Sequence, residues 1–437
     1  MTSYWLERAW VDGRTRDGVL VEVADGVFTR VDPDRPASGN RLAGLTVPGL
    51  ANCHSHAFHR ALRGRTQRER GSFWTWREQM YAVAARLTPD SYYELARATY
   101  REMAATGITS VGEFHYLHHG PDGTPYDDPN AMGAALLAAA QDAGIRIALL
   151  DTCYLAAGIG SPPEGVQVRF GDGDAERWAE RVSALVPAGP DQRVGAAIHS
   201  VRAVPRDQMK HVVAWADAHA APLHAHVSEQ VAENEACRAA YGRTPTEVLA
   251  DAGALGPRTS AVHATHLTEN DVALLGGSGT FADFCPTTER DLGDGIGPSR
   301  RLHDAGSRLT LGSDSHAVID LFEEMRAVEL DERLASRQRG HWSAAELLAA
   351  ATYDGHRSLG FAAGRIEVGA PADLVTLDTA SVRTAGTGAD EGTAVFAAAG
   401  ADVVHVVRDG RVVATDRDRG DVGAELDRVI RRLWSDG

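Results

Sequence analysis

Two histidines separated by one residue, His54 and His56, end the first strongly apolar run of the sequence, residues 45–56. Successive side chains of a strand point to opposite faces, so these two imidazoles would project to the same face. Neutral imidazoles placed together in this way are typical zinc ligands. The pair alone would fit an ordinary polar strand end equally well, so further residues must decide between the two interpretations.

Residue types that bind metals recur at the ends of later apolar runs. His226, His263 and Asp314 each stand at such an end. Histidines scattered by chance would not fall so regularly at strand ends. A metal bound by three such histidines and one aspartate keeps an open position for water, which is typical of a catalytic zinc site. The pattern therefore predicts a hydrolytic metal site formed by the ends of several strands.

Apolar runs of strand length alternate with longer amphipathic stretches, such as residues 89–106 and 131–143, which is typical of βα units around a parallel sheet. Eight such runs are present, at residues 45–56, 110–116, 146–154, 193–201, 222–227, 260–266, 280–285 and 308–314. Eight units predict a (β/α)8 barrel, in which the working residues lie at the carboxyl ends of the strands. That architecture would bring the histidines and Asp314 to one mouth of the barrel.

Shorter strands with turn signals precede and follow this region. We predict that residues 1–47 and 363–437 combine into one small β domain, with a terminal helix within residues 421–434. Residues 48–362 would then form the barrel. The predicted fold class is α/β, a TIM-like barrel with a small β domain formed from both chain termini.

The composition limits the partners that we expect. A formal net charge of −16 over 437 residues disfavours nucleic acid and anionic membranes. No stretch approaches the ~20 uninterrupted apolar residues of a membrane span, and the first residues lack the pattern of a signal peptide. The four cysteines are scattered, as expected for reduced thiols. We expect a cytoplasmic homodimer without nucleic-acid or membrane partners.

The order of the motifs, His-x-His, His, His and Asp on strands one, five, six and eight, resembles the amidohydrolase superfamily. The resemblance implies that the metal ligands are His54, His56, His226 and Asp314. It also implies that Glu229 and His263 lie beside the metal as acid–base and electrostatic groups. The expected cofactor is one zinc ion per chain, although these ligands also suit iron or another divalent ion.

Dinuclear members of that superfamily bridge two metals with a carbamylated lysine at the end of strand four. In this sequence that strand ends near His199, and the only lysine, Lys210, lies eleven positions further along in a predicted helix. A lysine there would not reach the metal. The sequence therefore favours a mononuclear centre of the deaminase branch, which adds water to the carbon of a C=N bond.

Finer motifs resemble the formimidoylglutamate deiminases of bacterial histidine degradation. They are residues 52–64, 72–81, 112–119, 199–205, 226–230 and 285–295, which span the predicted barrel. The resemblance implies hydrolysis of N-formimidoyl-L-glutamate to N-formyl-L-glutamate and ammonia. In the mechanism that we hypothesise, Asp314 accepts a proton from water, Glu229 protonates the leaving nitrogen and His263 stabilises the tetrahedral intermediate.

A small dicarboxylate substrate, the partner that we expect, needs local cations in an acidic protein. Arg77 and Arg202, with Arg63 as a further candidate, fall near the predicted mouth, and arginine binds carboxylates through paired hydrogen bonds. Tyr116, at the end of strand two, could offer a hydroxyl to a carboxylate or to the formimidoyl group. His59 stands where that family often has a glutamine that contacts the substrate, and histidine can still donate a hydrogen bond.

Two other functions stay open on the sequence. The first is another mononuclear-zinc aminohydrolase that acts on a purine, a pterin or an adenosyl compound. Its pocket would favour aromatic and amide side chains over two arginines. The second is a non-catalytic metal-binding barrel, which a metal assay and loss of activity on chelation would separate from an enzyme.

Overall fold

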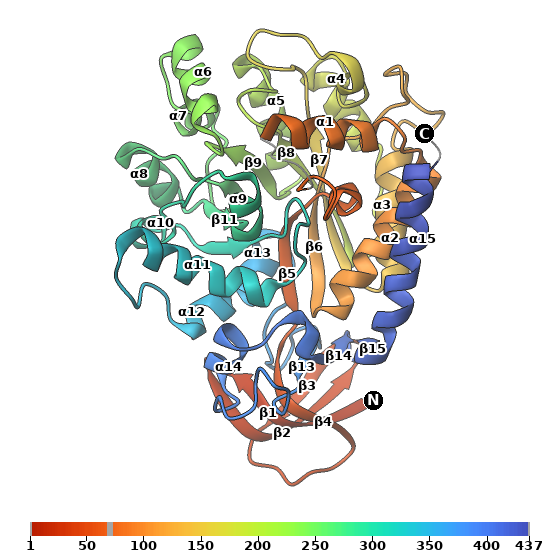
Figure 1. Ribbon diagram of the computed structural model, residues 1–437, viewed down its shortest axis with the longest axis vertical. Helices are drawn as coiled ribbons and strands as arrows, with labels where there is room; N and C mark the ends of the chain where they lie inside the picture. The colour runs from red at the N-terminus through yellow and green to blue at the C-terminus, as the bar shows by residue number, and fades with distance from the viewer. Residues whose placement is uncertain (1, 68–72, 436–437) are drawn as a thin grey trace.

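Eight parallel strands form the centre of the molecule, and each pairs with its neighbour in the sequence (Figure 1). The computed structural model describes residues 2–67 and 73–435, without the side chains of residues 73 and 74, so the start of the 72–81 motif lies outside the described residues. The strands are β5 (Leu50–Ser55), β6 (Ile108–His115), β7 (Arg146–Cys153), β8 (Gln192–Ile198), β9 (Leu223–Val227), β10 (Thr259–His263), β11 (Phe281–Phe284) and β12 (Leu309–Leu311). A parallel bridge between Ser55 and Asp314 joins the two edges, which confirms the predicted barrel.

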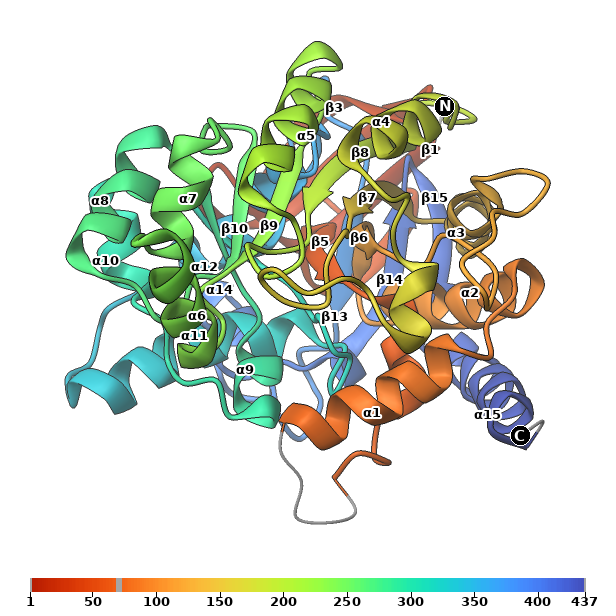
Figure 2. The ribbon, with the colours of Figure 1, turned by 90° about the horizontal axis from the view of Figure 1, so that it is seen from above.

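Helices surround these strands (Figure 2). They include α2 (Pro89–Ala105), α3 (Ala131–Ala143), α4 (Ala175–Ser183), α5 (Arg206–Ala218), α6 (Val231–Tyr241), α7 (Pro245–Asp251), α8 (Glu269–Ser278), α9 (Pro286–Leu292), α10 (Ser299–Ala305), α11 (Leu321–Ser336), α12 (Ala344–Ala349) and α13 (Gly355–Ser358). Thr88 begins α2 by accepting a hydrogen bond from the Ser91 N–H. Gly144 ends α3 at φ 76°, a left-handed conformation that glycine adopts without a steric penalty.

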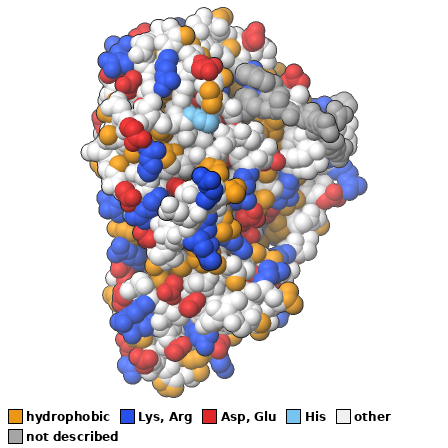
Figure 3. Space-filling view, turned by 60° about the vertical axis from the view of Figure 1, so that its left-hand side comes forward, with side chains coloured by type: hydrophobic (Ala, Val, Ile, Leu, Met, Phe, Trp, Pro, Cys, Tyr) orange, Lys and Arg blue, Asp and Glu red, His pale blue; other side chains and the backbone are white. Residues whose placement is uncertain are grey.

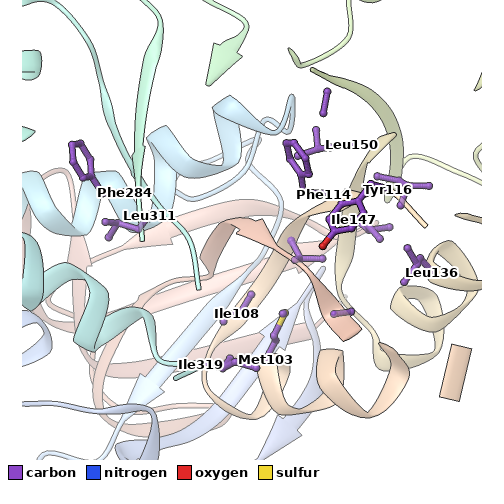
Figure 4. Packing of buried hydrophobic residues seen from close by; sticks show 14 of the residues in the cluster. Met103, Ile108, Phe114, Tyr116, Leu136, Ile147, Leu150, Phe284, Leu311 and Ile319 are labelled. Atoms are coloured by element: carbon purple, nitrogen blue, oxygen red, sulfur yellow. The ribbon is translucent and has the colours of Figure 1, made fainter. Parts of the chain in front are cut away.

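Apolar side chains from strands and helices meet in one large core, part of which is shown in Figure 4. Phe114, Ile147 and Leu150 come from strands, and Met103 and Leu136 come from α2 and α3; all five are buried. Each buried side chain of this size contributes roughly 1.5–3 kcal/mol. The core fixes the strands, and through them the residues at the strand ends.

Both ends of the chain contribute to a second, seven-stranded sheet at the lower end of the molecule in Figure 1. It consists of β1 (Thr2–Val11), β2 (Arg14–Ala24), β3 (Val27–Asp32), β4 (Asn40–Pro48), β13 (Leu374–Leu377), β14 (Val403–Arg408) and β15 (Arg411–Thr415). In the sequence, the short helix α14 (Glu391–Phe396) lies between β13 and β14. The last helix, α15 (Arg419–Ser435), packs on α2, where Glu425 forms ion pairs with Arg97 and Arg101.

The first predicted strand, residues 45–56, is two strands and not one. Its first part is the end of β4, which pairs antiparallel with β13, and its second part is β5 of the barrel. The break falls at Gly49, whose N–H donates to the Asp373 carbonyl and where a Cβ would collide with Thr109. The apolar pattern runs across this break because both strands are buried.

Acidic and basic side chains are interspersed on the face of the molecule seen in Figure 3. The negative net charge is therefore not gathered into a single block there. Among the described helices, none combines the length and the apolar character that a membrane span requires.

Arg146, at the start of β7, ties the barrel to the terminal sheet. Its guanidinium forms ion pairs with Asp373 and Asp409, and the side chains of Arg146 and Asp373 are only 5% and 1% exposed. We expect Arg146→Met to lower the free energy of unfolding by ~3 kcal/mol, because the substitution leaves a buried carboxylate without its partner. Denaturant unfolding measures this change. Arg411→Met, at an exposed arginine without an ion pair among the described residues, is the control, and equal stability of the two variants would contradict the prediction.

Candidate active site

The four predicted metal ligands lie near one another at the mouth of the barrel. His54 and His56 lie at the end of β5, His226 lies on β9, and Asp314 follows β12. The Nε2 atoms of His54 and His226 are 3.0 Å apart. Asp314 Oδ1 lies 3.4 Å from His54 Nε2 and 3.3 Å from His56 Nε2. The donor atoms of His54, His56 and Asp314 lie within 4.8 Å of one another, as do those of His54, His226 and His263, so the two groups meet at His54.

The hydrogen bonds of the histidines show that this cluster suits a cation. His56 Nδ1 lies 2.9 Å from the Phe114 carbonyl, and His226 Nδ1 lies 2.9 Å from the His199 carbonyl. A carbonyl only accepts, so both Nδ1 atoms carry hydrogen, and a neutral ring then presents the lone pair of its Nε2 atom. A neutral His56 and the Asp314 carboxylate, 3.3 Å apart, therefore offer two lone pairs to a cation or a proton between them.

The protonation states agree with this donor set. Burial lowers the pKa of His54 to about 4 and that of His226 well below its ordinary value. Burial opposes ionisation of Asp314, but the contacts with His54 and His56 hold its pKa well below the usual range. Three imidazoles and one carboxylate are a set that zinc prefers, with room left for a further ligand.

Asp314 and His263 both have a strained backbone, with φ of 37° and 67°. Non-glycine residues rarely adopt these values, and such strain gathers at functional sites. Asp314 is held in place by hydrogen bonds that its N–H donates to the His54 carbonyl and that its carbonyl accepts from the His56 N–H. The side chain is thereby fixed against the two histidines of β5.

Glu229 and His263, the predicted acid–base and electrostatic groups, line the same cavity as His56 and Asp314. His263 Nε2 lies 3.7 Å from Asp314 Oδ2, and His263 Nδ1 lies 3.4 Å from Glu289 Oε1. Burial lowers the pKa of His263, but the hydrogen bond to Glu289 and the charges of Glu229 and Asp314 outweigh burial and raise it to about 10. His263 can therefore act as a hydrogen-bond donor in this cavity.

The four predicted substrate contacts also line that cavity: His59, Arg77, Tyr116 and Arg202. His59 Nε2 lies 3.1 Å from the Tyr116 hydroxyl. Arg202 Nη2 lies 3.4 Å from Glu229 Oε2, so a cation stands directly beside the predicted acid. Arg63 is different, because it pairs with Glu102 and with the carbonyl of His316, and it does not line this cavity.

Comparison with known proteins decides the family. Residues 45–413 match the model of the amidohydrolase family, which is most of the chain. The chain belongs to this family. It is therefore a hydrolase that acts on C–N bonds, in a family whose members typically bind a metal.

Relatives of this amidohydrolase include a deiminase and a deaminase. A formimidoylglutamate deiminase of Pseudomonas aeruginosa is 39% identical over 86% of each chain. A 5-methylthioadenosine/S-adenosylhomocysteine deaminase of Natronomonas pharaonis is 29% identical over 90% of this chain and 87% of its own. The crystal structure of an amidohydrolase from Brucella melitensis has a TM-score of 0.90 at 31% identity, covering 99% of this chain and 100% of its own.

The amidohydrolase has further cavity residues that the sequence analysis did not assign to the site. His199 and Tyr154 follow β8 and β7, and their rings lie 4.6 Å apart between centroids. Both stand at the end of a predicted run, so the rule that found the metal ligands could have found them. Tyr81 and Phe170 also line the cavity, but they come from α1 (Phe73–Ala84) and from a loop, where that rule gives no signal.

Three further histidines, His224, His266 and His316, lie near the strand ends, and two of them make side-chain hydrogen bonds. His316 Nε2 lies 3.1 Å from the Ser55 hydroxyl, and His266 Nε2 donates to the Asp294 carbonyl at 2.8 Å. His224 is buried and makes no side-chain hydrogen bond with the described residues. None of the three lines the cavity.

A second group of metal-binding residue types, His115, His118 and Asp151, lies outside this cavity. The Arg181 guanidinium contacts both carboxylate oxygens of Asp151, at 2.8 and 2.9 Å. A bound arginine both uses these oxygens and repels a cation. Among the described residues, the strand-end cluster is therefore the better metal site.

Proposed function

We propose that this amidohydrolase hydrolyses N-formimidoyl-L-glutamate to N-formyl-L-glutamate and ammonia, with one zinc ion per chain. The observation that carries the proposal is the presence of two arginines, Arg77 and Arg202, in the cavity beside the metal-binding residues. Two guanidiniums suit a substrate with two carboxylates. The similarity to the Pseudomonas aeruginosa formimidoylglutamate deiminase, at 39% identity, supports the same substrate.

Zinc is proposed from the chemistry of the donors. Three imidazoles with one carboxylate, and no thiolate among the four, form a small site with an open position. A divalent ion bound there supplies Lewis acidity and lowers the pKa of water towards ~7. His54, His56, His226 and Asp314 would hold it.

The residues of the chain then have separate tasks in the hydrolysis. Water adds to the formimidoyl carbon, and its proton passes to the carboxylate of Asp314. Glu229 gives a proton to the imino nitrogen, which becomes the amino group of a tetrahedral intermediate. The hydroxyl of that intermediate then returns a proton to Glu229 while Asp314 passes its proton to the amino group, so the carbonyl forms, the C–N bond to that nitrogen breaks and ammonia leaves. His263 donates a hydrogen bond towards the charge that develops on the adding oxygen. The products are N-formyl-L-glutamate and ammonia, and no other reactant is consumed.

A deaminase of an adenosyl compound is the second candidate. The Natronomonas pharaonis deaminase of adenosyl compounds is 29% identical, and the cavity has aromatic walls, formed by Trp76, Tyr116, Tyr154 and Phe170. A nucleoside carries no carboxylate pair, whereas the cavity holds two guanidiniums, Arg77 and Arg202. The charge of the cavity therefore favours the dicarboxylate.

Replacing Arg202 should weaken substrate binding specifically. We expect Arg202→Met to raise KM at least ~10-fold, because a hydrogen-bonded charged contact is worth about 1.5–3 kcal/mol. Steady-state kinetics measures this change. Arg206→Met is the matched control, since that exposed arginine pairs with Asp251 outside the cavity. An Arg202→Met enzyme with unchanged KM would show that Arg202 does not bind the substrate.

Ammonia release from a set of substrates tests the proposal. We expect kcat/KM for N-formimidoyl-L-glutamate to exceed the values for S-adenosylhomocysteine and guanine by several orders of magnitude. Preference for S-adenosylhomocysteine would establish the second candidate instead. No ammonia from any of the three would refute both.

A further inference from the structure

Gln167 lies directly behind two tyrosines of the cavity wall. It belongs to the 3-10 turn Gly165–Arg169 between β7 and α4, and only 3% of it is exposed. Its Nε2 lies 3.0 Å from the Tyr81 hydroxyl and 2.8 Å from the Tyr154 hydroxyl. Both tyrosines line the cavity, whereas Gln167 does not. The residue can therefore affect the site only through the tyrosines.

A backbone hydrogen bond fixes the orientation of the Gln167 amide. The Glu164 N–H donates to Gln167 Oε1 at 3.3 Å. A backbone N–H cannot accept, so the oxygen of the amide must face Glu164 and the nitrogen must face the tyrosines. The two hydrogens of Nε2 are thus available for the two hydroxyl oxygens.

This orientation decides what the hydroxyls can offer to a ligand. Each tyrosine oxygen accepts from Gln167, so each keeps its own hydrogen for donation. The Tyr81 and Tyr154 hydroxyls are also close enough to hydrogen-bond to each other. If the two hydroxyls share one hydrogen between them, the other still points away from Gln167. At least one O–H donor therefore faces the cavity.

Cations stand beside these donors. Burial lowers the pKa of Arg202, but the nearby carboxylates of Glu233 and Glu229 raise it overall, and Arg202 lines the same cavity as the two tyrosines. The Arg77 guanidinium carbon lies 5.5 Å from the centroid of the Tyr81 ring. Hydroxyl donors next to a guanidinium are suited to a carboxylate, which accepts from both.

We propose that Gln167 is a positioning residue that turns the Tyr81 and Tyr154 hydroxyls towards the cavity as hydrogen-bond donors for a substrate carboxylate held at Arg202. The inference rests on the proposed function, because it assumes a carboxylate substrate. The rival explanation is that Gln167 only ties α1 to the end of β7. The two explanations differ in what happens when the polarity of the amide is reversed.

Gln167→Glu makes that reversal with little change of shape. The introduced carboxylate still accepts from Glu164, but it also accepts from the tyrosines and so draws their hydrogens away from the cavity. Gln167→Met removes both hydrogen bonds without reversing them. Competitive inhibition by glutarate, a dicarboxylate without a formimidoyl group, is the measurement, made at pH 8 in the wild type and in a Tyr81→Phe/Tyr154→Phe background.

We expect Gln167→Glu to raise the inhibition constant of glutarate ~10-fold and Gln167→Met to raise it roughly 3-fold, with kcat changed less than about 3-fold. In the background without hydroxyls, neither substitution should have a further effect, since the coupling runs through the hydroxyls. Equal weakening in both backgrounds, or a loss of kcat with inhibition unchanged, would overturn the proposal. If Gln167→Glu does not fold, the comparison of Gln167→Met in the two backgrounds decides.

Hydrolysis and glutarate binding by the wild-type enzyme distinguish a failure of this proposal from a failure of the proposed function. If it neither hydrolyses N-formimidoyl-L-glutamate nor binds glutarate, both proposals fail. If it does both and the Gln167 variants behave like the wild type, the proposed function stands and only the role of Gln167 is refuted.

Discussion

Glu229→Gln should lower kcat by ~10³-fold, because a positioned general acid typically contributes 10²–10⁴-fold and an amide cannot transfer the proton. The metal content should stay unchanged, since Glu229 is not one of the four converging donors. Stopped assays of ammonia release and elemental analysis of the same sample measure the two quantities. Glu229 lines the cavity beside Arg202, so KM should change far less than kcat.

Glu235→Gln is the control for this substitution. Glu235 lies on α6 and is exposed, whereas Glu229 precedes this helix and is buried. Full activity in Glu235→Gln together with the loss in Glu229→Gln would assign the proton transfer to Glu229. A Glu229→Gln enzyme that works as well as the wild type would contradict the mechanism.

Removal of the metal should abolish turnover almost completely. A Lewis acid contributes several kcal/mol to such a reaction, so dialysis against a chelator should lower kcat at least ~10³-fold. About one equivalent of zinc per chain should restore activity. The melting temperature should also fall on removal and rise again on addition, because an ion that binds the folded state alone stabilises it.

His226→Ala gives an independent form of this prediction. It removes one donor from β9 and should lower both zinc content and activity, while His224→Ala, two residues earlier on the same strand, should keep the metal. His224 is buried, so its variant tests whether loss of any buried imidazole has the same effect. Equal loss of zinc in both variants would contradict the ligand assignment.

The barrel could be predicted because each strand is buried and therefore reads as a continuous apolar run. The ends of these runs fall within a few residues of the observed strand ends, and His54, His56 and His226 follow from that. Asp314 is the exception in its local structure, since it lies beyond β12 in a strained backbone. Its residue type and its place at the end of an apolar run indicated Asp314, but its conformation depends on hydrogen bonds to β5.

The remaining parts of the site depend on contacts between distant segments. Gln167 contacts Tyr81 across 86 positions of the sequence, and β4 pairs with β13 across more than 300. Neither contact leaves a periodic pattern, because the turn around Gln167 is not a regular element and the register of β4 is set by its partner strand. The division between β4 and β5 was missed for the same reason.

The oxygen that enters the product tests the central claim most directly. In water labelled with ¹⁸O, hydrolytic deimination should give N-formyl-L-glutamate with one labelled oxygen on the formyl carbon, together with one ammonia per product. That result requires water to add to the formimidoyl carbon and the C–N bond to the imino nitrogen to break. Formation of L-glutamate and formamide, or no turnover by the zinc-loaded enzyme, would contradict the account.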